Sequence, residues 1–285
     1  MLMEDLFTRT EWLIGEEGIE RLKRSNVLVV GLGGVGAYAA EMLCRAGIGN
    51  ITIVDHDTIS ESNINRQLAA LESTVGMEKT EIMTQRLKDI NSRLNVNAVT
   101  QYLKDEKIAQ ILQGERYDYV VDAIDTISPK VYLIATCVEK GIPVVSSMGS
   151  GDRLDPTMIH IADISQTFNC PLARMIRKKL HKLGIYEGVA SVFSSETSEN
   201  SSAREDIGEN KRTNVGSISY MPAMFGCAVA SVVIRELIGI PAYQKTKDKR
   251  YYYNKKSSMV DLSEYTSKSK QQKQTDDGTN DRNIL

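Results

Sequence analysis

A glycine-rich turn that directly follows a short apolar run is the feature of this sequence that most constrains its fold. The run Asn26–Val30 is typical of a buried strand, and helical character begins at Ala37, after the turn. The turn holds four glycines in the GxGxxG spacing: Gly31, Gly33, Gly34 and Gly36. Glycines let the backbone bend sharply and approach a phosphate, and the following helix N-terminus supplies free N–H groups. The pattern therefore predicts a site for a phosphate-containing ligand.

An acidic residue at the end of the next strand-like run narrows the choice of ligand. Asp55 follows the run Ile51–Val54. It comes about twenty residues after the turn, where a carboxylate can accept hydrogen bonds from ribose hydroxyls. The strand, turn, helix and acid together favour a site for an adenosine-containing ligand. The alternative, that the glycines serve only close packing of helix and strand, is less favoured. These features do not separate NAD from ATP.

Strand-like and helical patterns alternate from Ser25 to Ile164, and this alternation predicts the fold class. Further strand-like runs are expected at 96–102, 117–121 and 142–146. Helical patterns are expected at 37–45, 78–90 and 106–112, together with a further helix that Pro129 could open. Strands that alternate with helices indicate right-handed crossovers and a largely parallel sheet. We therefore predict a Rossmann-like α/β fold in which helices flank the sheet.

The composition excludes several classes of protein. The chain has 35 Lys and Arg against 37 Asp and Glu, a net charge of −2, and is 41% hydrophobic and 25% charged. These values are typical of soluble globular chains and exclude collagen-like, disordered and polytopic membrane proteins. The four cysteines form no CxxC pair, so we expect neither a disulfide framework nor a zinc site. The N-terminal residues lack the features of a signal peptide, and we expect a cytoplasmic protein.

One apolar run has the length of a membrane span. Residues 215–234 contain no charged side chain, and a transmembrane helix needs about 20 apolar residues. Pro222, Gly226 and several serines interrupt the run, and Arg235-Glu236 follow it. We interpret it as a buried helix, a candidate for a subunit interface, and expect no association with a membrane.

We expect one catalytic domain over residues 1–250 and a basic and polar tail over 251–285. The tail is poor in apolar residues and cannot bury enough surface to order itself, so we predict that it is largely disordered. Within the domain, residues 191–214 are rich in Ser, Glu and Asn and predict a mobile crossover loop.

Charged residues after the second strand-like run distinguish a site for ATP from a site for NAD. Arg66 lies in the sequence NINRQ, Lys79 precedes a helical pattern, and Asp122 and Asp125 follow the run 117–121. Fixed cations stabilise the charge that builds on a triphosphate during transfer, whereas a dehydrogenase has no particular need of them. A carboxylate at the end of a parallel strand can hold Mg²⁺ against phosphates. This set favours an enzyme that depends on ATP and Mg²⁺.

These motifs resemble the ubiquitin-activating (E1-like) adenylating superfamily, which includes the thiamine and molybdopterin sulfur-carrier activators. The match covers residues 5–165 and consists of FTRTEW, VVGLGGVG, the strand-end acid, NxNRQ, VGxxK and DAID. The resemblance implies a ThiF-type adenylation fold and a homodimer in which Arg9 crosses to the neighbouring subunit's nucleotide. It also implies roles for six residues: Arg66 and Lys79 grip the triphosphate, Asp55 binds the ribose, Asp125 binds Mg²⁺, and Asp57 and Asn63 line the ATP pocket.

Finer features resemble one subgroup, the tRNA threonylcarbamoyladenosine dehydratases. They are NxNRQ with asparagine in the third place, DAID followed by Pro129-Lys130, the run from Gly149 to Pro156, and the later Asp163…Pro171-Leu172-Ala173. The likeness extends to about Ile240. This family uses ATP to cyclise the threonylcarbamoyl side chain of the adenosine beside the anticodon. The ureido nucleophile lies a few atoms from the activated carboxyl group, and such intramolecular reactions reach effective molarities of about 10⁵–10⁸ M.

We expect no cysteine to act as a nucleophile. Residues 191–214 contain no cysteine, whereas E1 enzymes carry a cysteine-bearing segment for thioester transfer. Cys170 and Cys227 lie in apolar or packed sequence contexts, which disfavours a reactive thiolate. The chemistry is therefore expected to end at an acyl-adenylate, as in the superfamily. The residues themselves do not decide whether the α- or the γ-phosphorus is attacked.

Two basic segments are candidates for tRNA contacts. The first follows Pro171 and holds Arg174, Arg177, Lys178, Lys179, His181 and Lys182. The second, residues 245–256, holds Lys249, Arg250 and Tyr252 around a run of three tyrosines. Cations neutralise phosphates and aromatic rings stack on unpaired bases. A solvated basic face with core or interface tyrosines explains the same residues equally well.

Three other functions remain open. A zinc-less activator of a ubiquitin-like sulfur-carrier protein would need a partner that ends in Gly-Gly. An NAD(P)-dependent oxidoreductase is disfavoured by the residues after Asp55, and a non-catalytic nucleotide-binding scaffold by the intact Arg, Lys and Asp set. The sequence also leaves open a monovalent cation (Na⁺ or K⁺) at the dimer interface and a sulfur-relay protein as a partner.

Overall fold

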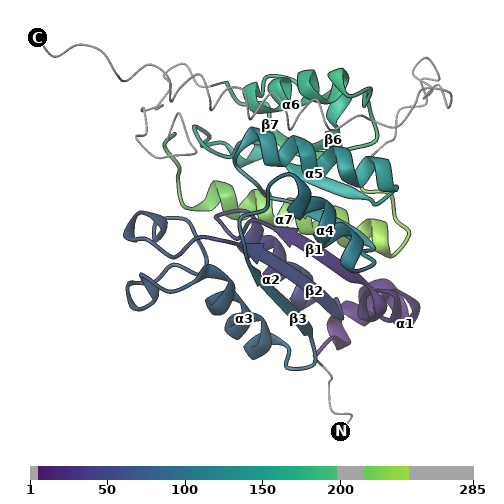
Figure 1. The fold of residues 1–285 in the computed structure, drawn as a ribbon. Coiled ribbons are helices and arrows are strands. Elements are labelled where there is room, and N and C mark those ends of the chain that lie inside the picture. Colours follow the sequence, from purple (N-terminus) through teal and green to yellow (C-terminus); the bar gives the residue numbers. More distant parts are fainter. Residues whose placement is uncertain (1–5, 198–214, 244–285) are drawn as a thin grey trace, which may run out of the picture.

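The computed structural model describes residues 6–197 and 215–243 (Figure 1). Seven strands form one sheet in the order β3-β2-β1-β4-β5-β7-β6, in which only β6 and β7 are antiparallel neighbours. The strands are β1 (Asn26–Val30), β2 (Asn50–Asp55), β3 (Asn95–Thr100), β4 (Tyr119–Asp122), β5 (Val144–Ser147), β6 (Ile159–Asp163) and β7 (Ala190–Ser194). The helices are α1 (Thr8–Arg24), α2 (Gly36–Ala46), α3 (Lys79–Ile90), α4 (Glu106–Gly114), α5 (Ile127–Lys140), α6 (Pro171–Lys182) and α7 (Tyr220–Leu237). The predicted Rossmann-like α/β fold is confirmed.

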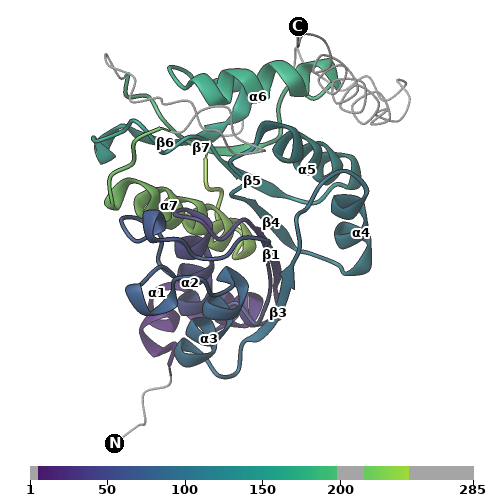
Figure 2. The ribbon, with the colours of Figure 1, turned by 60° about the vertical axis from the view of Figure 1, so that its left-hand side comes forward.

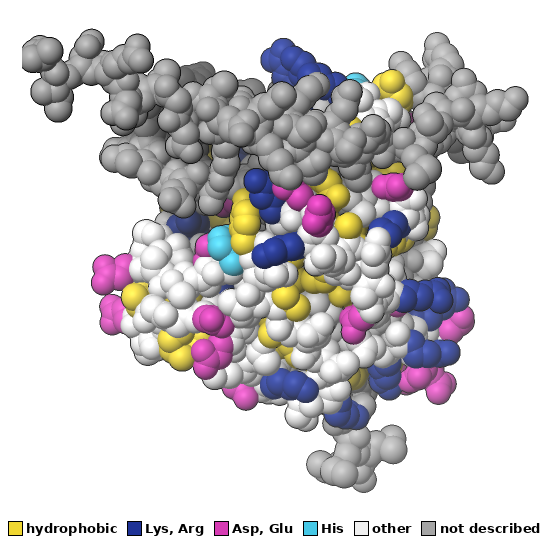
Figure 3. Space-filling view, in the orientation of Figure 1, with side chains coloured by type: hydrophobic (Ala, Val, Ile, Leu, Met, Phe, Trp, Pro, Cys, Tyr) yellow, Lys and Arg dark blue, Asp and Glu magenta, His cyan; other side chains and the backbone are white. Residues whose placement is uncertain are grey.

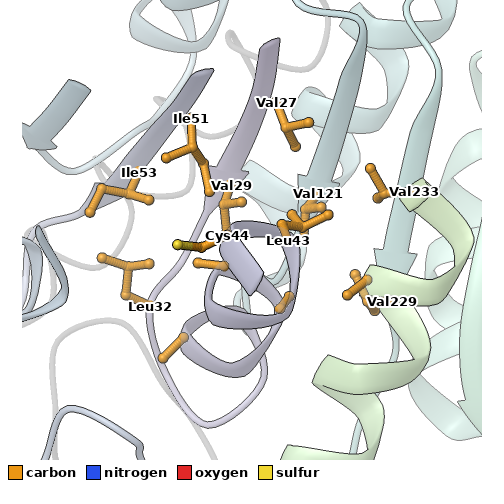
Figure 4. Close-up of a cluster of buried hydrophobic side chains, with 14 of the residues drawn as sticks. Val27, Val29, Leu32, Leu43, Cys44, Ile51, Ile53, Val121, Val229 and Val233 are labelled. Carbon is orange, nitrogen blue, oxygen red and sulfur yellow. The ribbon is translucent and has the colours of Figure 1, made fainter. Parts of the chain in front are cut away.

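The central strands are buried on both faces because helices cover both sides of the sheet. In β1, Val27 and Val29 belong to one hydrophobic core, and Leu28 and Val30 belong to the other. The first core lies between the sheet and α2, α3 and α7, and the second between the sheet and α4, α5 and α6 (Figure 2). Figure 4 shows strand side chains meeting those of α2 and α7 in the first core. Two-sided burial is the reason that the strands read as continuous apolar runs.

The apolar run 215–234 forms the greater part of α7, which packs against α2 and the sheet. Phe225, Val229 and Val233 are fully buried there. At Gly226 a Cβ would lie 2.6 Å from the carbonyl oxygen of Val35, so glycine allows the close approach of α7 to α2. The prediction of a buried helix is confirmed for the face that packs on α2 and the sheet, whereas Tyr220 and Met224 are exposed. Within the described ranges α7 is the one helix long and apolar enough to cross a membrane, a test that core helices also pass.

The prediction that a mobile loop begins at residue 191 is wrong. Residues 191–194 belong to β7, which pairs with β5 on one side and β6 on the other. Serine content suggested exposure, but Val192 and Phe193 are completely buried in opposite cores and hold the segment in the sheet. Helix α1 and strand β6 are further elements that the sequence patterns did not predict. Residues 198–214 and the predicted tail 251–285 lie outside the described residues.

The strand order makes the carboxyl end of β1 a topological switch point, the kind of place where open α/β sheets form a ligand-binding crevice. Val30 pairs with Val54 of β2 on one side and with Asp122 of β4 on the other. The chain therefore leaves β1 toward one side of the sheet and later continues on the other side. In open α/β sheets, ligands bind at the carboxyl ends of strands at such a point. The glycine-rich turn follows Val30 directly, so the fold places it at this crevice.

Candidate functional site

The glycine-rich turn packs tightly against the ends of neighbouring strands. Gly31 has a φ of +92°, which favours glycine, and its N–H donates to the carbonyl oxygen of Val54 at 2.8 Å. A Cβ on Gly36 would lie 1.8 Å from the carbonyl oxygen of Gly31, so only glycine fits where α2 begins. The N-terminus of α2, the positive end of its dipole, is thus held at this edge of the sheet, where it can attract an anion.

Asp55 is held in place by the backbone of the turn and of its own loop. Its Oδ2 accepts a hydrogen bond from the amide of Leu32 at 2.7 Å, and its Oδ1 accepts one from the amide of Asp57 at 2.8 Å. Each carboxylate oxygen has a second lone pair, so this half-buried group can still accept bonds from two hydroxyls. The geometry agrees with ribose binding by Asp55, which stays a prediction.

Lys79 opens α3 and points its ammonium group toward the loop that follows β2. Its side chain is 5% exposed, and Nζ lies 2.9 Å from Oδ2 of Asp57. His56 Nε2 lies 3.2 Å from Oδ1 of the same carboxylate, which is itself half exposed. Asp57 therefore fixes the position of the Lys79 ammonium at this edge of the sheet. A contact between Lys79 and a triphosphate stays a prediction.

Arg66 and Asp125 come from different loops and lie close enough to interact electrostatically. Arg66 is half-buried, and its Nη1 donates to Ser62 O and to Asn65 Oδ1, each at 2.8 Å. Burial lowers the pKa of the Arg66 guanidinium, and the neighbouring charge of Asp125 opposes this change. The fold therefore brings together the cation and the carboxylate that the sequence assigned to the triphosphate and to Mg²⁺.

The two carboxylates after β4 have different environments. Asp122 is completely buried: its Oδ2 accepts from Ser146 Oγ at 2.6 Å and lies 2.9 Å from Lys130 Nζ. Burial raises the pKa of Asp122, and the charge of Lys130 opposes this rise. Asp125, by contrast, is exposed. Asp122 thus organises the loop, and of the pair only Asp125 reaches solvent.

The donor chemistry at this edge suits Mg²⁺, which prefers carboxylate and water oxygens. Asp125 presents an exposed carboxylate beyond the end of β4. Asp55, His56 and Asp57 also place three ligand atoms within 4.8 Å of one another. However, Asp55 is bonded to two backbone amides and Asp57 to Lys79. The exposed position of Asp125 makes it the better fit of the two, and its role as the Mg²⁺ ligand stays a prediction.

Arg9 and Asn63, the two other predicted ATP-site residues, have different positions in the structure. Arg9 is exposed in the first turn of α1, which Figure 1 shows well away from α3 and the loops beside it. This placement agrees with a role in a neighbouring subunit, which stays a prediction. Asn63 is half-buried, and its Oδ1 accepts a hydrogen bond from Ser60 N at 3.2 Å, so it shapes the loop that carries Arg66.

Helix α6 carries the described part of the predicted tRNA surface. Arg174 and Lys178 are exposed on it, and Figure 3 shows Lys and Arg side chains at the top of the molecule, over α6. Arg177 instead turns inward and donates through Nη1 to the carbonyl oxygens of Thr167 at 2.9 Å and Ile164 at 3.3 Å. This anchoring argues against Arg177 as a phosphate contact. The candidates Lys249, Arg250 and Tyr252 lie outside the described residues.

The two cysteines that the sequence placed in apolar or packed contexts differ in their exposure. Cys170 is buried, but Cys227 is exposed on the side of α7 that faces away from the core. A uniformly apolar sequence did not show which face of the helix would reach the surface. Partial desolvation still raises the pKa of the Cys227 thiol, so less of it is thiolate than in a free cysteine. The expectation that no cysteine acts as a nucleophile stays a prediction.

The sequence and the fold both have counterparts among known proteins. The model of the ThiF family matches residues 8–276. The chain belongs to the ThiF family. The match begins in α1 and spans every described helix and strand, so both hydrophobic cores and the carboxyl edge of the sheet lie within it.

Relatives with assigned names cover most of this ThiF-family chain. It is 39% identical over 251 residues to the tRNA threonylcarbamoyladenosine dehydratase of Bacillus subtilis (strain 168), which covers 85% of this chain and 98% of that protein. It is 40% identical over 197 residues to the Escherichia coli (strain K12) protein of the same name, covering 67% and 73% of the two chains. The crystal structure of the E. coli enzyme in complex with ATP matches with a TM-score of 0.73 and 34% identity, covering 84% of this chain and 97% of that one.

Sequence reasoning did not assign three buried polar residues of this ThiF-family chain: Gln67, Lys130 and Arg153. Gln67 follows Arg66, is 9% exposed, and its Oε1 has no hydrogen-bond partner. Lys130 is the one charged residue in the run 129–138, a signal that could have revealed a buried ion pair. Arg153 lies in the loop after β5, where no pattern distinguishes a buried guanidinium from a solvated one.

Proposed function

We propose that this chain is an ATP-dependent tRNA threonylcarbamoyladenosine dehydratase. The observation that carries the proposal is the match to the B. subtilis enzyme of that name, because it extends over 98% of that protein. Arg66 interacts electrostatically with Asp125, and Lys79 pairs with Asp57, the second residue after Asp55; these charges support ATP as the co-substrate. The match to a crystal structure of an E. coli relative in complex with ATP points the same way.

The proposed reaction activates the carboxylate of the threonylcarbamoyl group. A carboxylate oxygen attacks the α-phosphorus of ATP, pyrophosphate leaves, and an acyl-adenylate forms. The ureido nitrogen of the same side chain then attacks the acyl carbon, loses its proton, and displaces AMP. The oxygen lost from the substrate leaves with AMP, so the nucleoside loses the elements of one water. Proximity makes the second step fast without a covalent enzyme intermediate.

Each charged group of the crevice has a place in this chemistry. Arg66 and Lys79 bind the triphosphate and stabilise the charge that develops as pyrophosphate leaves. Asp55 accepts hydrogen bonds from the ribose, and the turn binds phosphate through backbone amides. Mg²⁺, when bound, neutralises phosphate charge, and Asp125 is the residue that would hold it.

The proposal extends to the assembly and its surroundings. We infer a cytoplasmic homodimer in which Arg9 reaches the neighbouring active site, with residues 1–250 as the catalytic domain and 251–285 as a tail. A monovalent cation at the dimer interface and a sulfur-relay partner belong to the same hypothesis. The tRNA would lie against Arg174 and Lys178 of α6, because exposed cations neutralise phosphates.

One experiment tests the function directly. The protein is incubated with ATP, Mg²⁺ and tRNA that carries threonylcarbamoyladenosine, and the nucleosides are then analysed by mass spectrometry. The expected result is a nucleoside that has lost one water, with AMP and pyrophosphate released in equal amounts. tRNA without the threonylcarbamoyl group serves as the control and should stay unchanged. If ATP–pyrophosphate exchange instead requires a small protein that ends in Gly-Gly, the chain is a sulfur-carrier activator.

A further inference from the structure

Arg153 is a buried cation in the loop that follows β5. The residue is 8% exposed, and its Nη1 donates to the carbonyl oxygen of its neighbour Asp152 at 2.8 Å. Its Nε is buried and has no hydrogen-bond partner. None of the ion pairs formed within residues 6–197 and 215–243 includes Arg153. Among the residues of these two ranges, the guanidinium thus has one neutral acceptor and no carboxylate partner.

Such an arrangement is unfavourable unless an anion binds to it. A buried charge costs free energy unless it is paired, and arginine cannot escape this cost by losing its proton. A guanidinium presents five N–H donors in a planar fork that matches the two oxygens of a carboxylate or a phosphate. The combination of burial and an unbonded Nε therefore suits Arg153 to receive an oxyanion.

The segment before α7 joins the Arg153 loop to the ATP crevice. The amide of Asp152 donates to the carbonyl oxygen of Gly216 at 2.9 Å. The next residue, Ser217, accepts a hydrogen bond from Asn65 Nδ2 at 3.0 Å, and Asn65 is the immediate neighbour of Arg66. The loops of Arg153 and Arg66 are therefore held on the two sides of one short segment.

The loop itself is fixed from both ends. Glu196 accepts hydrogen bonds from the amides of Leu154 and Asp155, both at 2.9 Å. Tyr220 donates from its hydroxyl to the carbonyl oxygen of Leu154 at 2.8 Å. The carboxylate of Glu196 is thus bonded to backbone amides beside Arg153. A fixed loop holds the guanidinium ready for a ligand, which lowers the ordering cost of binding.

We propose that Arg153 binds the carboxylate of the threonylcarbamoyl group and orients it toward the nucleotide; this rests on the function proposed above. The strand ends give the reason: Asp55 ends β2, the glycine-rich turn follows β1, Asp125 follows β4 and Arg153 follows β5. With the ribose at Asp55 and the phosphates at the turn, the β5 loop lies on the β4 side of the turn, and the segment through Gly216 and Ser217 ties it to the loop of Arg66. A carboxylate held by Arg153 would thus lie beside the phosphates. A phosphate of the nucleotide is the other source of the same oxyanion chemistry.

Two substitutions and one control test this assignment. Arg153→Met removes the charge and keeps much of the volume, Arg153→Lys keeps the charge without the fork, and Arg24→Met changes an exposed arginine of α1. Four quantities are measured for each: the thermal midpoint of the free protein, the Kd for ATP, the Kd for tRNA without the threonylcarbamoyl group, and the KM and kcat for the modified tRNA.

The proposal predicts that Arg153→Met changes the KM for modified tRNA and leaves the binding of ATP and of unmodified tRNA nearly unchanged. Arg153→Met should unfold at the same or a higher temperature than the wild type, because an unpaired buried charge is removed. Its Kd values for ATP and for tRNA lacking the threonylcarbamoyl group should stay within about twofold of wild type. Its KM for modified tRNA should rise about tenfold or more, the usual effect of losing a charge-assisted hydrogen bond. Arg153→Lys should recover part of this loss, and Arg24→Met should behave as wild type.

Other outcomes would overturn the assignment. A higher Kd for ATP in Arg153→Met would show that Arg153 binds a phosphate of the nucleotide and not the carboxylate of the substrate. A lower thermal midpoint with unchanged binding and kinetics in Arg153→Lys would show that the arginine is structural. If the wild type does not dehydrate modified tRNA, the proposed function fails and the carboxylate assignment fails with it. The thermal midpoint and the ATP measurement then still decide whether Arg153 binds an anion.

Discussion

The ammonium group of Lys130 lies 2.9 Å from the carboxylate of Asp122, and both side chains are completely buried. Lys130 Nζ also donates to the carbonyl oxygen of Ile124 at 2.9 Å, and Asp122 Oδ1 accepts from the amide of Ile124 at 3.1 Å. The pair therefore fixes the chain between Asp122 and Asp125. The backbone of Ala123, in the same loop, packs against the glycine-rich turn at Gly31. One buried ion pair thus sets the position of the turn relative to the predicted Mg²⁺ ligand.

Lys130→Met should destabilise the fold by about 3–5 kcal/mol, because it leaves the carboxylate of Asp122 buried and unpaired. Urea unfolding measures the effect. Lys140→Met, at the exposed end of the same helix, should change stability by less than about 0.5 kcal/mol. The double variant Asp122→Asn/Lys130→Met should recover much of the loss. A cost below about 1 kcal/mol for Lys130→Met would show that the pair does not organise the loop.

Arg66→Ala and Lys79→Ala should each lower the rate of tRNA dehydration by about 10²–10³-fold, because each removes a fixed cation from the developing charge. Both variants should keep the native fold, since the partner of Lys79, Asp57, is half exposed and can be solvated. Circular dichroism checks that the fold is native, and single-turnover kinetics measure the rate of dehydration. Lys107→Ala, a change at an exposed lysine, is the matched control. Activity like that of the wild type in both variants would refute the phosphate contacts.

Asp125→Ala should abolish most activity and remove its dependence on Mg²⁺ concentration. The exposed carboxylate is the predicted ligand, so the variant should lose saturation by Mg²⁺ in the millimolar range while the unfolding midpoint stays unchanged. Titration of activity with Mg²⁺ and with EDTA measures this. Asp89→Ala, an exposed carboxylate of α3, is the control and should titrate as the wild type does. An unaltered Mg²⁺ titration in Asp125→Ala would place the ion elsewhere.

Glu41→Gln should destabilise the protein at neutral pH but much less in acid. Burial alone would raise the pKa of Glu41, but hydrogen bonds and charges from Arg86 and Arg45 outweigh it and lower the pKa. A depressed pKa stabilises the fold above the unfolded-state value of about 4.3, and this contribution disappears as pH falls through the folded-state value.

The free energies of unfolding of wild type and Glu41→Gln, measured at several pH values, test this dependence. Their difference should be largest near neutral pH and should shrink below about pH 4. Glu61→Gln, a change at an exposed glutamate, should show no such trend. A constant difference from neutral pH into acid would mean that the charge of Glu41 is not what the arginines stabilise.

Cys227→Ser should retain full dehydration activity, because the proposed reaction forms no thioester. Cys227 is the exposed member of the four cysteines, and its raised thiol pKa makes it a poor nucleophile at neutral pH. Activity assays of this variant, and of the wild type after alkylation with iodoacetamide, provide the test. A loss of more than about tenfold in Cys227→Ser would reopen a covalent route.

The sequence by itself determined the nucleotide-binding half of the fold. Gly31 and Gly36 stand where no side chain fits, and the alternation of apolar runs with helical patterns follows from a sheet buried on both faces. These are local requirements, so they appear at fixed spacings along the chain. For the same reason Arg66, Lys79 and Asp125 could be picked out, because each follows a strand whose carboxyl end must lie at one edge of a parallel sheet.

Only the tertiary structure decided which charges are buried and what they meet. Asp122 and Asp125 look alike in DAID, yet Asp122 pairs with Lys130 inside the molecule and Asp125 reaches solvent. Arg153 is buried in a loop that Glu196, Gly216 and Tyr220 hold by hydrogen bonds. Residues 191–194 form a strand because β5 and β6 pair with them. Burial and pairing depend on contacts between residues far apart in the chain, and no local pattern of side chains encodes them.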